Sequence, residues 1–166
     1  TWLTCYPDIL PADVIDTILD VTIENCTWLQ SNSFEWLINL DKERLAVSLA
    51  ETVSADRKSG FGQDENGNCR PFGSGAEEHK WLTGLWDDLN RANEKNYMEE
   101  IFDICSFSFN GEEYILRDAC EGEIDWDIPG GQPVVGLNTG CGGRWTSRLW
   151  PEKYWISLSS LLRKEG

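Results

Sequence analysis

Apolar residues along this chain gather in short runs that alternate with polar, glycine-containing segments. Residues 34–40 (FEWLINL) form an almost continuous apolar run between polar neighbours, which is typical of a strand buried in a parallel sheet. Further extended segments are expected at residues 2–4, within residues 14–21 and at residues 58–62, where a glycine turn ends the strand. A polar, glycine-containing excursion follows at residues 63–75.

Helical periodicity is found between and after these strands. Leu45, Leu49 and Val53 fall on one face of a helix that follows the first long apolar run. Two more helices are expected at residues 77–90 and 96–107, the second with one apolar side. Because strands and helices alternate, the pattern predicts an α/β fold with a largely parallel sheet.

The pattern starts anew after residues 118–132, an acidic and then proline- and glycine-rich stretch that is typical of a linker. An apolar strand with Val134, Val135 and Leu137 follows, then a glycine-rich loop, and a helix is expected to begin at Pro151. Parallel sheets bind ligands beyond the carboxyl ends of their strands. One such end lies on each side of the linker, so we expect a ligand cleft between two lobes.

Composition narrows the classes of function. The 166 residues carry 29 Asp and Glu against 14 Lys and Arg, a formal net charge of −15. This charge disfavours non-specific binding to nucleic acid or to an anionic membrane. No apolar run is long enough to span a bilayer, and no signal peptide is recognised, although the chain begins with Thr1 rather than methionine. The nine tryptophans and 40% hydrophobic residues indicate a folded protein.

The cysteine pattern indicates neither a zinc site nor a dense disulfide framework. The six cysteines are scattered without a CxxC or CxxH pair, and His79 is the only histidine, so a zinc site is not expected. Six cysteines in 166 residues are sparse for a disulfide framework, which favours reduced thiols and leaves the framework as the alternative. No nucleophile accompanies His79 in the sequence, and we expect no catalytic role for it.

One window of the acidic chain lacks acids altogether. Residues 128–151 contain no Asp or Glu over 24 positions, where the chain average would place about four. A strand, a glycine-rich loop and a helix N-terminus coincide in this window, a combination that often holds phosphate. The window therefore predicts an anion site.

Backbone N–H groups at the end of the expected strand, two arginines and two hydroxyls make up the candidate phosphate ligands. These seven residues are Asn138, Thr139, Gly140, Arg144, Thr146, Ser147 and Arg148. Each side chain also has an ordinary alternative: an exposed arginine covering Trp150, a solvated loop arginine, or hydroxyls that cap the next helix. On the other side of the linker, Asn39 and Asp41 follow the buried strand and are candidates to orient an acceptor or the neighbouring Lys42, with helix capping as the alternative.

Several separated segments resemble one family in the same order. The stretch GLNTGCGGRWTSRLWPEKYW (residues 136–155) is similar to glycosyltransferase family 9, the bacterial heptosyltransferases of lipopolysaccharide core assembly. FEWLINLDKE (34–43), RKSGFG (57–62) and GEEYILR (111–117) resemble the same family. Arg148 stands where the family usually has lysine beside the donor diphosphate, which keeps the charge but changes the geometry.

The resemblance implies a GT-B arrangement of two facing Rossmann-like domains. Residues 1–117 would form most of the N-terminal, acceptor-side domain, 118–132 the linker, and 133–166 the first βα unit of the C-terminal, donor-binding domain. The general base would precede Thr1, and later nucleoside-binding strands would follow Gly166. The 166 residues alone are therefore expected not to turn over.

The implied reaction is an inverting transfer of a sugar, heptose in this family, from an ADP-heptose type donor to a lipopolysaccharide-core or related glycan acceptor. It needs no metal and no cofactor, and it takes place in the cytoplasm with peripheral contact at the inner face of the inner membrane. Two alternatives stay open: a non-catalytic nucleotide- or sugar-phosphate-binding module, and an α/β protein of another nucleotide-sugar class.

Overall fold

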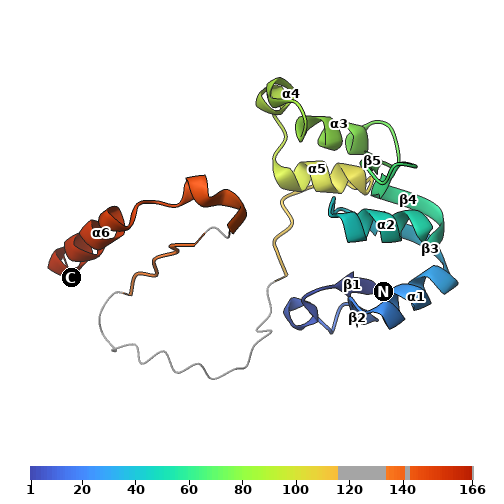
Figure 1. Ribbon diagram of the computed structural model, residues 1–166, viewed down its shortest axis with the longest axis horizontal. Helices are drawn as coiled ribbons and strands as arrows, with labels where there is room; N and C mark the ends of the chain where they lie inside the picture. Colours follow the sequence, from blue (N-terminus) through green and yellow to red (C-terminus); the bar gives the residue numbers. More distant parts are fainter. Residues whose placement is uncertain (116–133, 141–142, 166) are drawn as a thin grey trace. The chain divides into compact units, whose positions relative to one another are not determined.

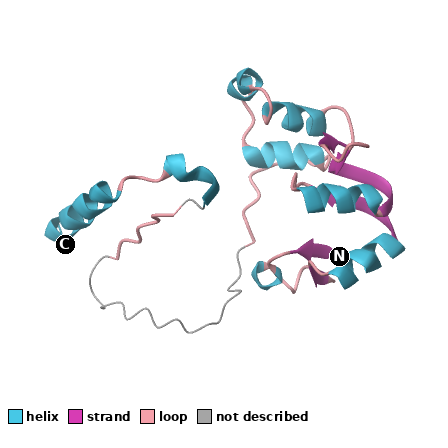
Figure 2. Cartoon of the chain, in the orientation of Figure 1, coloured by secondary structure: helices cyan, strands magenta, loops and turns pink. Residues whose placement is uncertain are grey.

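The computed structural model describes residues 1–115, 134–140 and 143–165, and the chain divides into two units, residues 1–120 and 121–166. Small sheets and helices make up the first unit, and helices with irregular segments the second (Figures 1 and 2). This mixture confirms the α/β content predicted from the sequence. The described elements do not by themselves identify a Rossmann-like or GT-B arrangement.

A two-stranded parallel sheet opens the first unit. β1 (Trp2–Thr4) pairs with β2 (Ile18–Asp20), and a short 3-10 helix, η1 (Pro7–Ile9), lies between them in the chain. Both strands fall where the apolar pattern predicts extended segments.

Helix α1 (Ile23–Ser31) follows β2 and is not predicted by the apolar pattern. Its start is fixed by Thr22, whose hydroxyl accepts the backbone N–H of Asn25 at 3.2 Å. The Asn25 side chain also donates to the Asp20 carboxylate at 2.7 Å, which ties the helix to the end of β2. The threonine cap is the signal in the sequence that marks this helix.

The second sheet has three strands in the order β3–β4–β5. β3 (Ser33–Asn39) and β4 (Ser54–Gln63) are parallel, as predicted, with Asn39 opposite Gly60. β5 (Cys69–Pro71) is antiparallel to β4, so the sheet is mixed rather than wholly parallel. The reason is local: a tight turn between β4 and β5 returns the chain directly, and no helical crossover intervenes.

Helix α2 (Arg44–Thr52) joins β3 to β4 and packs on β4. The centre of the core is formed by Val47 of α2, Phe61 of β4 and Ile104, each about 1% exposed. Full burial of side chains of this size contributes about 1.5–3 kcal/mol each. Leu45, which the periodicity places on the same helix face as Leu49, is 57% exposed.

Three helices complete the first unit: α3 (Ala76–Thr83), α4 (Asp87–Ala92) and α5 (Tyr97–Ile104). The single helix expected at residues 77–90 is therefore two helices. The break is at Gly84, which caps the end of α3 and has a poor helix propensity. α3 packs against both α5 and β5, which places the helices over the short antiparallel strand.

The second unit departs from the sequence prediction at its start. Residues 134–140 have no regular secondary structure, and Val134 and Val135 are more than half exposed, so the expected strand is not formed. A strand needs a neighbour for its backbone groups, and the described part of this unit offers none. A 3-10 turn, η2 (Gly143–Arg148), and helix α6 (Glu152–Glu165) follow, the helix close to the predicted start. The predicted linker at 118–132 lies outside the described residues.

Candidate functional site

Asn39 and Asp41, the predicted acceptor-side residues, lie together at the carboxyl end of β3. The Asn39 amide nitrogen donates to the carbonyl oxygens of Phe61, at 2.6 Å, and of Asp41, at 3.0 Å. Its Oδ1 accepts the Asp41 backbone N–H at 3.2 Å. The Asp41 carboxylate accepts the N–H of Glu43 at 2.9 Å, directly ahead of α2. Both side chains therefore hold the turn between β3 and α2, but neither caps the helix, because the N-cap of α2 is Glu43 and no side chain caps it.

The same end of the sheet requires a glycine. Gly60 of β4 has a φ of +93°, and a Cβ built on it would lie 2.0 Å from the Asn39 carbonyl oxygen. No other residue type allows this backbone conformation at so close an approach. Gly60 and the Asn39 amide thus fix the geometry of this end of the sheet.

Lys42, which follows Asp41, connects the turn after β3 to α3. Its Nζ donates to the Lys80 carbonyl oxygen at 3.1 Å and lies 4.6 Å from the centre of the Phe61 ring. Loss of water around the Lys42 ammonium lowers its pKa, and the nearby Cys69 thiol acts in the opposite direction. The lysine predicted to accompany Asp41 therefore joins the end of β3 to the end of α3.

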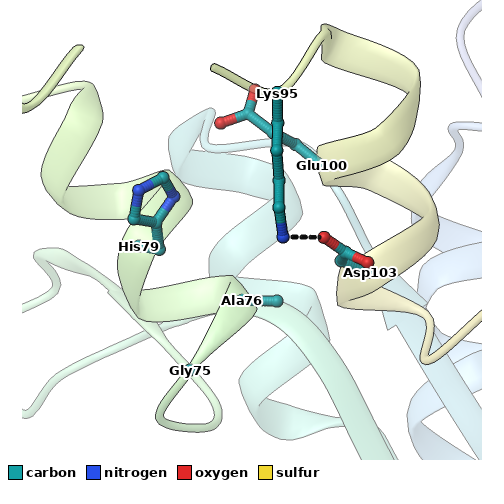
Figure 3. Close-up of a pocket in the computed structure, with 6 residues that line it drawn as sticks. All are labelled: Gly75, Ala76, His79, Lys95, Glu100 and Asp103. Carbon is teal, nitrogen blue, oxygen red and sulfur yellow. Dashed lines mark hydrogen bonds and ion pairs between the residues drawn. The ribbon is translucent and has the colours of Figure 1, made fainter. Parts of the chain in front are cut away.

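A charged hollow lies between α3 and α5 (Figure 3). It has a volume of about 320 Å³ and is lined by Gly75, Ala76, His79, Lys95, Glu100 and Asp103. The Lys95 ammonium and the Asp103 carboxylate form an ion pair on the α5 side of the hollow. The lining residues include no hydroxyl or thiol that His79 could activate, so the geometry gives that histidine no nucleophile.

Glu100 is the charged residue that the sequence analysis missed. Only 5% of it is exposed, and its carboxylate is held by an ion pair with Lys80 and by the Asn93 amide at 3.0 Å. It is part of an amphipathic helix, and its position in the pattern does not distinguish it from an exposed acid. The neighbouring Asn96, which caps α5 through a capping box with Glu99, is the recognisable signal nearby.

In the second unit, the predicted phosphate ligands occupy two short described segments. Asn138, Thr139 and Gly140 are exposed, and the Gly140 N–H donates to the Asn138 side-chain oxygen at 3.3 Å. Thr146, Ser147 and Arg148 are exposed in the last turn of η2. This turn is closed by a hydrogen bond from Leu149 N–H to the Thr146 carbonyl at 3.1 Å.

Three of the seven candidates thus lie in one turn, which residues 149–151 connect to α6. Arg144 also belongs to η2, and its side chain is outside the described part of the chain. The start of α6 is stabilised by its aromatic residues: Trp150 stacks on Tyr154 at 5.5 Å and meets the edge of Trp155 at 4.9 Å. Trp150 is nevertheless 46% exposed.

Among the described residues, no group of three or more His, Cys, Asp and Glu side chains gathers closely enough to hold a metal ion. None of the helices in that part of the chain combines the length and the apolar character needed to cross a membrane.

Comparisons of the chain with protein-family models, with curated proteins and with solved structures gave no match. The resemblance to glycosyltransferase family 9 therefore stays a prediction.

Proposed function

We propose that this chain belongs to a glycosyltransferase that moves a sugar, of the heptose type, from a nucleotide-diphosphate donor to a lipopolysaccharide-core or related glycan acceptor. The proposal includes a GT-B arrangement, with the donor on the second unit and the acceptor on the first. The support comes from four segments of the sequence that resemble one family in the same order, and from the chemistry of the turn before α6.

The observation that carries the proposal is the exposed turn formed by Thr146, Ser147 and Arg148, which ends three residues short of the 14-residue helix α6. One guanidinium and two hydroxyl groups, all exposed, are the groups of this turn that can bind an anion. No acid occurs over residues 128–151, and Glu152, the first residue of α6, is the first carboxylate after the turn. With a nucleotide-diphosphate donor, the diphosphate is the leaving group, and the transferase must hold it as the bond to the sugar breaks.

In the proposed reaction an acceptor hydroxyl attacks the anomeric carbon of the donor. A new carbon–oxygen bond forms, the bond from that carbon to the diphosphate oxygen breaks, and the configuration inverts. The hydroxyl proton passes to a general base, for which we assign no described residue. Arg148 and the backbone N–H groups of the loop would stabilise the negative charge that grows on the leaving diphosphate.

On the first unit, Asp41 is the better acceptor-side candidate of the predicted pair. The Asn39 amide nitrogen already donates to two carbonyl oxygens, whereas Asp41 is exposed at the end of β3. Its carboxylate can accept hydrogen bonds from sugar hydroxyls while one oxygen holds the turn. The proposed reaction needs no metal or organic cofactor and would run in the cytoplasm, with peripheral contact at the inner membrane.

A titration with ADP, followed by amide resonances of the chain, tests the donor side. We expect chemical-shift changes at Gly140 and at residues 146–148, because a bound diphosphate would change the surroundings of these exposed residues. Changes confined to the first unit, or none at millimolar ADP, would remove the loop from the donor site.

The same loop would serve a non-catalytic nucleotide- or sugar-phosphate-binding module. An assay of the complete protein for acceptor-dependent release of ADP from ADP-heptose separates the two functions. Release that requires the acceptor supports the transferase, and ADP binding without release supports the module.

A further inference from the structure

We draw no further inference here: the strongest candidate, the exposed apolar side chains of Ile38 and Leu40 at the end of the edge strand β3 together with Leu45 at the start of α2, carries none, because nothing in the structure shows what covers them.

Discussion

Gly60 and Asn39 lie opposite each other in the β3–β4 ladder, and the carbonyl oxygen of Asn39 occupies the space of a Cβ at Gly60. We expect Gly60→Ala to lower the free energy of unfolding by more than about 2 kcal/mol, because strain at positive φ adds to the steric overlap. Urea unfolding followed by circular dichroism measures the change.

Gly67 provides the matched control for this substitution. Its φ is +78°, and nothing lies within 4 Å of a Cβ built on it. Gly67→Ala should therefore lower the free energy of unfolding by only about 1 kcal/mol, the cost of placing alanine at positive φ. Equal effects of the two substitutions would show that the close approach of Asn39 does not constrain the sheet.

Ser106 has a left-handed backbone, with a φ of +59°, directly after the end of α5. Its hydroxyl accepts a hydrogen bond from the Arg57 guanidinium at 2.8 Å, and that guanidinium lies 4.1 Å from the Trp36 ring centre. The substitutions Ser106→Gly and Ser106→Ala both remove the hydroxyl. The difference between their free energies of unfolding therefore measures the cost of placing a side chain at positive φ. We expect the Ser106→Gly variant to be about 1 kcal/mol more stable than the Ser106→Ala variant. Equal unfolding midpoints of the two variants would argue against the left-handed conformation.

Sequence reasoning located the polar residues at the end of β3 but not their contacts. Asn39 and Asp41 could be identified because they follow an apolar run. The acceptor of the Asn39 amide, the carbonyl of Phe61, is 22 residues away in the chain and comes into reach only through the parallel register. The same limit applies to Glu100, whose partner Lys80 belongs to another helix.

Between elements, the ion pair of Lys80 and Glu100 joins α3 to α5. The side chain of Glu100 is 6% exposed and that of Lys80 22% exposed, so either charge left alone would be poorly solvated. We expect Glu100→Leu to lower the free energy of unfolding by about 3 kcal/mol, and Lys80→Met with Glu100→Leu together to cost less than the sum of the two single changes.

Denaturant titrations of the four proteins in this double-mutant cycle give the coupling. The exposed pair of Arg91 and Asp88 is the control, since both side chains are largely in water and their separation is 3.9 Å. Its cycle should give a coupling below about 1 kcal/mol. If the Lys80–Glu100 cycle gives no more than this, the ion pair does not hold the helices together.

The turn between β4 and β5 has its own pH response. The Asp64 carboxylate accepts the backbone N–H groups of Asn68, at 2.8 Å, and of Asn66, at 2.9 Å, and these bonds lower the pKa of Asp64. Because folding favours the ionised form, the stabilisation is complete above the ordinary carboxyl pKa and is lost as pH falls through the lowered value.

An NMR titration of the Asp64 carboxyl carbon tests this expectation. The amide shifts of Asn66 and Asn68 should follow the same midpoint, and they should not titrate in an Asp64→Asn variant. A midpoint at or above the ordinary value for aspartate would contradict the hydrogen-bonded turn.

The sequence predicts individual helices and strands well where the apolar pattern is regular, and poorly elsewhere. The strands β1, β3 and β4 and the helices α2, α5 and α6 fall near their predicted positions. The long helix expected at 77–90 is divided at Gly84, and the strand expected from Val134 is not formed. An apolar run specifies a strand only when another strand is present to pair with it, and a run of residues does not contain that information.

For the whole molecule, the uneven distribution of charge is the feature that connects structure with function. A chain with a net charge of −15 repels anions in general, yet residues 128–151 contain no acid and end at the start of α6. Thr146, Ser147 and Arg148 are exposed there. The sequence alone was sufficient to single out this loop, because the absence of acids and the helix start are both visible in it. The sequence does not show how this loop is placed relative to the first unit.

The ADP affinity of an Arg148→Ala variant, measured by NMR titration of the 166-residue chain, tests the donor-phosphate site most directly. Arg163→Ala, which removes an exposed arginine from the last turn of α6, is the matched control for net charge. We expect Arg148→Ala to weaken ADP binding at least about tenfold, since a charged hydrogen bond to phosphate is worth about 1.5–3 kcal/mol, and Arg163→Ala to bind like the unmodified chain. Equal ADP affinity of the Arg148→Ala variant and the unmodified chain would contradict the account.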